Sequence, residues 1–183
     1  SDVYKRQLWQ YLHGNAGLPG SNNKVVIFSQ WTSCLDLIAT MLDFYGVTHT
    51  RYDGRVNTFE EREQAIQTFR KPWCNVLLTS LGAGGEGVNL TCANYIVLME
   101  PYWNESAEQQ AIDRLHRIGQ MRPTHVLRLF MRASIEEWVQ SIQLRKANEL
   151  QRLLFERVCN EQDETYVGTK RNPGERLRDQ DRP

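Results

Sequence analysis

The chain has 183 residues, of which 40% are hydrophobic, and this length suits one compact domain with a sizeable core better than two. Because 22 lysines and arginines balance 22 aspartates and glutamates, net charge gives no indication of a nucleic-acid partner, and any DNA affinity requires a local patch. Four widely spaced cysteines without a C-x-x-C pair argue against zinc, and no apolar run reaches the roughly 18 residues of a membrane span, so we expect a soluble, intracellular protein with no membrane partner.

The first residues carry little information about the fold. Residues 2–7, Asp-Val-Tyr-Lys-Arg-Gln, can be back-translated to the end sequence of a transposase-based sequencing adapter, so we interpret residues 1–7 as a scar. Residues 8–13 have the pattern of a helix end, and residues 14–23 have the composition of a flexible linker. We therefore expect the folded domain to begin at Lys24.

Short apolar runs alternate with helical patterns from Lys24 onward. The predicted strands are residues 24–29, 48–52, 75–79, 95–99 and 126–131. Apolar residues recur at helical spacing in residues 35–45, which Gly46 closes, and in residues 59–70. Strands that alternate with helices at this spacing predict an α/β domain with a largely parallel sheet flanked by helices. We place this domain at residues 24–133.

The last quarter of the chain changes character. Ser134-Ile-Glu-Glu137 has the pattern of a capping box, and the apolar residues that follow lie largely on one stripe. We interpret residues 134–158 as one long helix whose first turns pack on the sheet. From Asn160 the apolar period is lost and the sequence becomes charged, so we expect residues 159–183 to form a disordered tail.

The stretch Gln110–Gln120 carries two arginines three residues apart. Asn104 or Ser106 can cap a helix through this stretch, which would place Arg114 and Arg117 on one face. Two permanently charged, forked donors on one edge suit a polyphosphate that loses a phosphoryl group. An exposed helix face with a chance arginine pair explains the same spacing equally well.

The full string resembles the last helicase motif of the Swi/Snf-type ATPases, the DNA translocases within helicase superfamily two. The motif of that family is Gln-Ala-x-x-Arg-x-His-Arg-x-Gly-Gln, and every fixed position is filled here. The resemblance implies that Arg114 and Arg117 reach across a cleft to ATP held by the other lobe, and it assigns Gln110 to the same nucleotide-binding group.

A glycine-rich loop first suggests a different ligand. Gly82-Ala-Gly-Gly-Glu-Gly87 follows a predicted strand and matches G-x-G-x-x-G, and Glu100 lies about where a ribose-binding acid would sit. A Rossmann unit needs a crossover helix of roughly 10–12 residues at minimum, and only residues 88–94 separate the last glycine from the next strand. The spacing therefore argues against an NAD site.

The same loop resembles the Ala-Gly-Gly-x-Gly-Leu-Asn-Leu motif of the Swi/Snf-type ATPases. By that resemblance Gly87 and Asn89 face the nucleotide, while Ser80 and Gly82 lie against the DNA backbone, where glycines allow close approach to phosphate oxygens. Relatives often carry Lys or Arg where this chain has Gly82, and this departure puts one expected phosphate contact in question. We interpret Glu86, at a variable place of the motif, as structural.

Two further matches extend the resemblance over residues 24–150. Val-Val-Ile-Phe-Ser-Gln-Trp-Thr, residues 25–32, resembles the motif that opens the second lobe, and residues 52–57 resemble its Asp-Gly motif. By these matches the DNA-binding candidates also include Ser29, Gln30, Asp53 and Gly54. The residues of these motifs are most similar to those of the subgroup that contains helicase-like transcription factor and the RING-bearing repair translocases.

The resemblance implies the second RecA-like lobe of a Swi/Snf-type ATPase that couples ATP hydrolysis to movement along double-stranded DNA. We expect a nuclear remodelling or repair protein, with nucleosomes as a candidate partner and with the long C-terminal helix bracing the two lobes. Because G-x-x-x-x-G-K-[ST] is missing, we assign no metal ligand to this chain; Mg²⁺ would be held by the first lobe, and this lobe alone should not hydrolyse ATP.

Two alternatives remain open. A non-catalytic DNA- or protein-binding module could use the same fold, with the arginines kept for salt bridges. A strand-separating helicase of the same superfamily is the other, although unwinding relatives usually end this motif in Gly-Arg-x-Gly-Arg rather than His-Arg-Ile-Gly-Gln.

Overall fold

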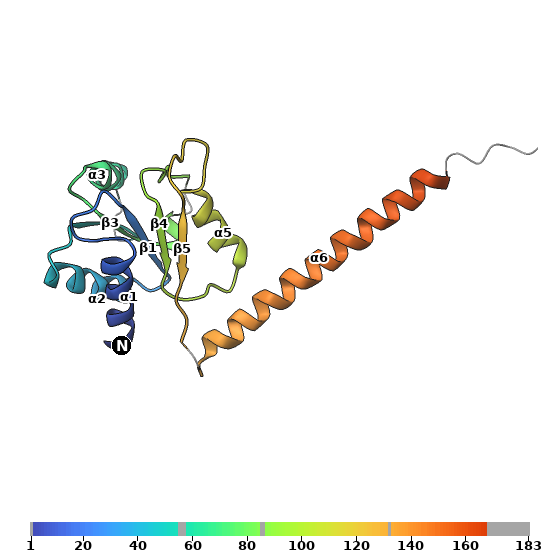
Figure 1. The fold of residues 1–183 in the computed structure, drawn as a ribbon, viewed down its shortest axis with the longest axis horizontal. Helices are drawn as coiled ribbons and strands as arrows, with labels where there is room; N and C mark the ends of the chain where they lie inside the picture. Colours follow the sequence, from blue (N-terminus) through green and yellow to red (C-terminus); the bar gives the residue numbers. More distant parts are fainter. Residues whose placement is uncertain (1, 55–57, 85–86, 132, 168–183) are drawn as a thin grey trace, which may run out of the picture. The chain divides into compact units, whose positions relative to one another are not determined.

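The computed structural model describes residues 2–54, 58–84, 87–131 and 133–167 (Figure 1). The chain divides into two units, Ser1–Gln143 and Leu144–Pro183. The elements in chain order are α1 (Asp2–Gly14), β1 (Val25–Ser29), α2 (Thr32–Phe44), β2 (His49–Tyr52), α3 (Phe59–Arg70), β3 (Val76–Ser80), α4 (Leu81–Gly84), β4 (Tyr95–Leu98), α5 (Glu105–Asp113), β5 (His125–Arg128) and α6 (Ile135–Val167).

The strands of the first unit form one sheet in the order β2-β3-β1-β4-β5, and every neighbouring pair is parallel. Ser29 lies opposite Ser80, and Tyr52 lies opposite Thr79, so the carboxyl ends of β1, β2 and β3 share one edge. The central strands are buried along almost their whole length because helices cover both faces. The predicted α/β fold with a parallel sheet is confirmed.

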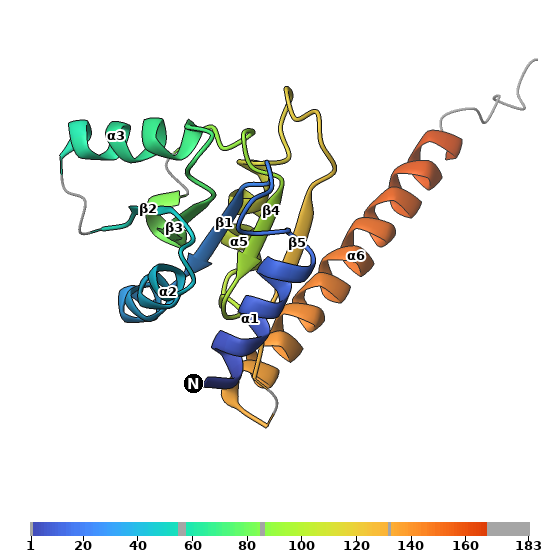
Figure 2. The ribbon, with the colours of Figure 1, turned by 60° about the vertical axis from the view of Figure 1, so that its left-hand side comes forward.

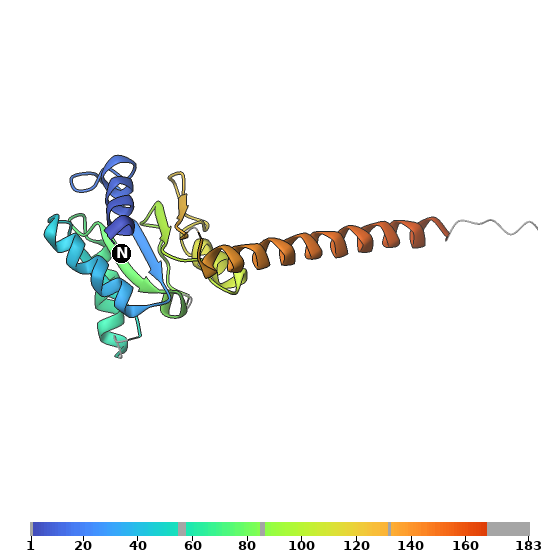
Figure 3. The same ribbon diagram turned by 90° about the horizontal axis from the view of Figure 1, so that it is seen from below.

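Two hydrophobic cores lie on the two faces of this sheet. Successive side chains of a strand point to opposite faces, so Val25 and Ile27 join one core while Val26 and Phe28 join the other. Helices α1 and α2 cover the first core, and α3, α4 and α5 cover the second. In Figure 2 α1 lies in front of the sheet and α5 behind it, and Figure 3 shows the same arrangement from below. Helix α3 has the bounds that its apolar period predicts, and a capping box between Thr58 and Glu61 fixes its start.

The segment before β1 differs from its sequence interpretation. Helix α1 begins at Asp2, and Leu8 and Leu12 of this helix are fully buried in the first core. Ala16 and Leu18 are buried there too, and Ser21 Oγ donates a hydrogen bond to Ala16 O at 2.8 Å. Residues 14–23 therefore pack on the sheet, where composition predicts a flexible linker. The origin of residues 1–7 stays a prediction.

The start of α6 is held differently from the predicted capping box. Ser134 Oγ accepts from the backbone N–H of Glu136 at 3.1 Å, and the Glu136 carboxylate accepts from Met131 N–H at 2.6 Å. Val139 is buried, as expected for first turns that pack on their own sheet. In the second unit α6 continues to Val167, beyond the predicted end of the helix at residue 158.

Residues 168–183, the remainder of the predicted tail, lie outside the described residues. Within the described part of the chain, none of the helices combines the length and the apolar character that a membrane span requires.

Candidate functional site

The arginine stretch follows α5, and this helix begins as predicted. Asn104 is the N-cap residue, and its Oδ1 accepts from Ser106 N–H at 3.1 Å. The helix ends at Asp113, however, so Arg114 is its C-cap and Arg117 lies in the turns beyond. The prediction that both arginines share one helix face is therefore wrong.

Contacts with the amino edge of the sheet explain this early helix end. The side-chain amide of Gln120 donates to Thr91 O, Ala93 O and Leu115 O at 3.2, 2.7 and 3.3 Å. Leu115 is fully buried in the second core, and Gly119 has φ +104°, a conformation that favours glycine. These contacts turn the chain away from the helix axis before it reaches Arg117.

The two arginines nevertheless lie on one open hollow. Gln110, Arg114 and Arg117 line a hollow of about 470 Å³ together with Asp113, His116 and Ile118. Arg114 is half-buried, whereas Arg117 and Gln110 are exposed. The structure thus brings together the three motif residues assigned to the nucleotide, on a surface that a second body can approach.

The glycine loop lies beside this segment. Gly87 has φ +80°, which favours glycine, and Asn89 Oδ1 accepts from the N–H and the hydroxyl of Thr91 at 3.0 and 2.8 Å. Leu90 N–H donates to Arg114 O at 3.1 Å and so ties the loop to the end of α5. Residues 85 and 86, including Glu86, lie outside the described part of the loop.

Gly87 and Asn89 line a second hollow, of about 280 Å³, whose far wall is α3. Arg62 and Arg70 contribute to that wall, Tyr52 of β2 also lines the hollow, and the Arg62 guanidinium lies 5.9 Å from the centre of the Tyr52 ring. The nucleotide-facing candidates therefore divide between two hollows, which the hydrogen bond from Leu90 to Arg114 connects.

The DNA-binding candidates gather at the carboxyl edge of the sheet. Ser29 and Ser80 end β1 and β3, Asp53 and Gly54 follow β2, and Gly82 lies in the short helix α4. Gly82 is exposed, its φ lies outside the left-handed region, and a Cβ placed there meets no described atom within 4 Å. A side chain at Gly82 is therefore tolerated, and the alternative that this glycine is needed for a positive φ is wrong.

Comparison with known proteins identifies the family. A model of the helicase conserved C-terminal domain matches residues 5–119, more than half of the chain. The chain belongs to this family of helicase C-terminal domains. It is the C-terminal lobe of a Swi/Snf-type ATPase of helicase superfamily two, as the motifs predict.

The individual relatives agree with the predicted subgroup. The lobe is 49% identical over 124 residues to DNA repair protein rad8 of Schizosaccharomyces pombe, an alignment that covers 67% of the chain and 11% of that protein. It is 38% identical over 136 residues to helicase-like transcription factor CHR27 of Arabidopsis thaliana, covering 74% of the chain and 13% of the relative. The chain thus spans about an eighth of the length of these curated relatives.

A solved structure supports the fold. The C-terminal part of the Fun30 ATPase domain superposes with a TM-score of 0.67 at 30% sequence identity, covering 76% of this chain and 43% of that chain. The RecA-like architecture of the lobe is therefore shared with an ATPase domain of known structure.

Two of the DNA-binding candidates, Ser29 and Asp53, have buried side chains that do not fit a direct contact with DNA. The Ser29 side chain is fully buried, and its hydroxyl donates to the Glu100 carboxylate at 2.9 Å and accepts from Trp31 N–H at 3.1 Å. The Asp53 side chain is fully buried and pairs with Arg51. Both side chains are used internally, so they support the edge of the sheet rather than contact a ligand.

Gln30 is half-buried, so it fits a direct DNA contact better than Ser29 and Asp53 do. Its side-chain amide donates to Pro101 O at 3.2 Å, and its backbone N–H donates to the Glu100 carboxylate. Ser80 Oγ accepts from Ala83 N–H at 3.3 Å and so begins α4. Gln30, Gly54, Ser80 and Gly82 remain as candidates at this edge.

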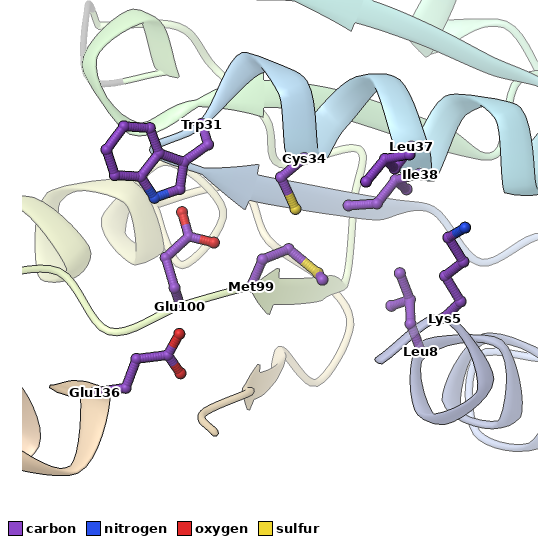
Figure 4. A pocket seen from close by; sticks show the side chains of 9 residues that line it. All are labelled: Lys5, Leu8, Trp31, Cys34, Leu37, Ile38, Met99, Glu100 and Glu136. Carbon is purple, nitrogen blue, oxygen red and sulfur yellow. The ribbon is translucent and has the colours of Figure 1, made fainter. Parts of the chain in front are cut away.

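Sequence reasoning missed the role of Glu100, which it considered only for a nucleotide ribose. Figure 4 shows the Glu100 carboxylate beneath Trp31, with Glu136 below it on the same side of a mostly apolar pocket of about 220 Å³. Burial raises the pKa of Glu100, and hydrogen bonds from Gln30 and Ser29 oppose that shift. Glu100 therefore stabilises the turn from β1 to α2 by accepting hydrogen bonds from it. Its position at the end of the strand beside β1 is a signal that could have indicated this role.

Proposed function

We propose that this lobe is the second motor lobe of an ATP-dependent translocase that moves along double-stranded DNA in a nuclear repair or remodelling protein. The observation that carries the proposal is the open hollow where Gln110, Arg114 and Arg117 lie together. Arg117 is exposed, so its guanidinium is accessible to a phosphate presented by another lobe. The names of the relatives, a DNA repair protein among them, support a DNA partner and, through it, a nuclear location.

The proposed chemistry is electrostatic. A phosphoryl group that leaves ATP spreads negative charge over its oxygens, and a guanidinium brought beside it stabilises that charge at the transition state. The first lobe would hold ATP and Mg²⁺. This lobe would add Arg114 and Arg117 only when the cleft between the lobes closes, which couples hydrolysis to a movement.

The proposed DNA contact lies at the carboxyl edge of the sheet. Gln30 and Ser80 are only half-buried there, and Gly54 and Gly82 expose backbone without a side chain in the way. Short polar residues and exposed backbone suit contacts with phosphate oxygens, which carry no sequence information. The proposal therefore predicts DNA binding independent of sequence, and nucleosomes are a candidate substrate.

The test changes Arg117 to Ala in the complete protein. We expect kcat for DNA-stimulated ATP hydrolysis to fall by about 10³-fold, the scale of a lost arginine finger, while DNA affinity stays within about twofold. Lys146→Ala, which removes an exposed cation of α6, is the control and should leave kcat unchanged. An unchanged kcat in Arg117→Ala would favour a non-catalytic module, and an equal loss of DNA affinity would show that Arg117 contacts DNA or maintains the fold.

A further inference from the structure

A buried carboxylate lies behind the arginine segment. Glu108 on α5 is 2% exposed. Its Oε1 accepts from Tyr102 N–H at 2.7 Å and from the Gln143 side-chain amide at 3.1 Å, and its Oε2 accepts from Arg128 Nε at 3.2 Å. These partners come from the loop after β4, from α6 and from β5. One side chain thus connects α5 to three other segments of the same unit.

Gln143 makes the connection to α6. Its side-chain amide also donates to Tyr102 O, so it bridges the loop and the Glu108 carboxylate. More than one turn earlier, the ring of Trp138 packs edge-on against Trp103 with the ring centres 5.6 Å apart. The first turns of α6 are therefore fastened to residues 102–103 and to α5.

The charge of Glu108 makes this arrangement sensitive to change. The Arg128 side chain is 53% exposed, so it is only partly withdrawn from water while the carboxylate is buried. A buried carboxylate is stable only while its hydrogen bonds are kept, and losing one donor is costly. The position of α5 should therefore follow the position of Gln143.

Helix α5 leads directly to the candidate nucleotide site. Gln110 lies two residues after Glu108, and Arg114 is the C-cap of the same helix. The carbonyl of Arg114 also accepts from Leu90 N–H at 3.1 Å, so a displacement of α5 reaches the glycine loop as well. A shift of about 1 Å in a catalytic side chain is enough to slow a reaction by about 10²-fold.

We propose that Gln143 and Glu108 are positioning residues through which the first turns of α6 hold Gln110, Arg114 and Arg117 in place for the nucleotide. This inference rests on the proposed function, because it requires the arginines to act on ATP. Neither Glu108 nor Gln143 lines the hollow where the arginines lie. A partner that displaces the start of α6 changes the rate of hydrolysis through this link.

The experiment compares two Gln143 variants in the complete protein. Gln143→Glu places a second carboxylate about 3 Å from Glu108, and Gln143→Leu removes both hydrogen bonds at similar volume. Gln140→Glu and Gln140→Leu are the controls, because Gln140 is also half-buried on α6 and makes neither of these bonds. The readouts are kcat and KM for ATP, DNA affinity and the thermal midpoint.

We expect both Gln143 variants to lower kcat by about 10- to 100-fold with DNA affinity within about twofold, while the Gln140 variants match the parent protein. The decisive arm repeats Gln143→Leu in an Arg117→Ala background. If Gln143 acts through the arginines, the second change costs clearly less there than in the parent protein, because residues that act as a unit are not additive.

The same fold-loss in both backgrounds, or an equal loss in the Gln140 controls, would overturn the inference in favour of a general structural role. Arg117→Ala also separates the two proposals. An unchanged kcat in that single variant would defeat the proposed function and this inference together. A large loss in Arg117→Ala, combined with Gln143 variants that behave like the Gln140 controls, would defeat this inference alone.

Discussion

The carboxyl edge of the sheet and the segment after α5 use their polar side chains in opposite ways. At the edge, Ser29 and Asp53 are buried and bonded to Glu100 and Arg51. After α5, Arg117 is exposed to solvent. The edge therefore presents a prearranged surface of backbone and a few half-buried groups, whereas the arginine segment presents charge to a body outside the lobe.

This contrast separates two kinds of defect. A substitution of a buried side chain at the edge, Ser29 or Asp53, should mainly cost stability, because it removes a bonding partner of another group. A substitution at Arg117 should mainly cost activity, because an exposed side chain contributes little to the free energy of unfolding.

Asp53→Ala should give the largest change in stability. It removes the buried partner of Arg51, which keeps its ion pair with Asp36, and we expect the free energy of unfolding to fall by about 2 kcal/mol. Asp113→Ala, which removes an exposed carboxylate of α5 bonded to Gln109, should change it by less than about 0.5 kcal/mol. Urea unfolding of the chain measures both. Equal losses would remove the distinction between the two regions.

Gly82 gives a second test of this contrast, because it is an exposed position of the edge. Gly82→Lys should tighten DNA binding at low salt and steepen the slope of log K against log salt by about 0.9, the effect of one more phosphate contact on duplex DNA. Gly82→Ala should leave both stability and slope nearly unchanged, since its Cβ enters open space. DNA titrations of the complete protein at several salt concentrations provide the measurement. A lysine that leaves the slope unchanged would move the DNA contact away from this edge.

Glu100→Gln is expected to have the smallest effect, and it depends on pH. Because burial raises the pKa of Glu100 above its ordinary 4.5, the folded state binds the proton more tightly than the unfolded state. The parent chain therefore loses stability relative to the Gln variant as the pH rises from 4.5 through the raised pKa. Unfolding midpoints of both proteins at pH 4.5, 5.5 and 7 test this. A difference that does not grow with pH would mean that no buried charge holds this turn.

Local sequence patterns predicted the elements that depend on neighbouring residues. The apolar runs of the strands and the period of α3 are properties of a few consecutive side chains, and both appear close to their predicted bounds. The Asn104 cap at the start of α5 is equally local, because its partner Ser106 is two residues away.

The features that the sequence did not predict depend on residues far apart in the chain. After α5, the Gln120 side chain donates a hydrogen bond to Ala93 O, 27 residues away. The Ser29 hydroxyl donates to Glu100, 71 residues away. Leu18 is buried only because the sheet lies beneath it. Linker composition and motif position do not identify these distant partners, so the prediction of a flexible linker was wrong and the bond from Ser29 to Glu100 was not predicted.

The proposed function requires this lobe to supply arginines to ATP held by a first lobe. The most direct measurement is DNA-stimulated ATP hydrolysis by the 183-residue chain alone and by the same chain joined to the first lobe of a Swi/Snf-type relative. We predict no hydrolysis above a buffer control for the chain alone, clear hydrolysis for the joined protein, and loss of that hydrolysis in the joined Arg117→Ala variant. Robust ATP hydrolysis by the isolated chain, or a joined Arg117→Ala variant as active as its parent, would show that this lobe does not supply an arginine to ATP held by another lobe.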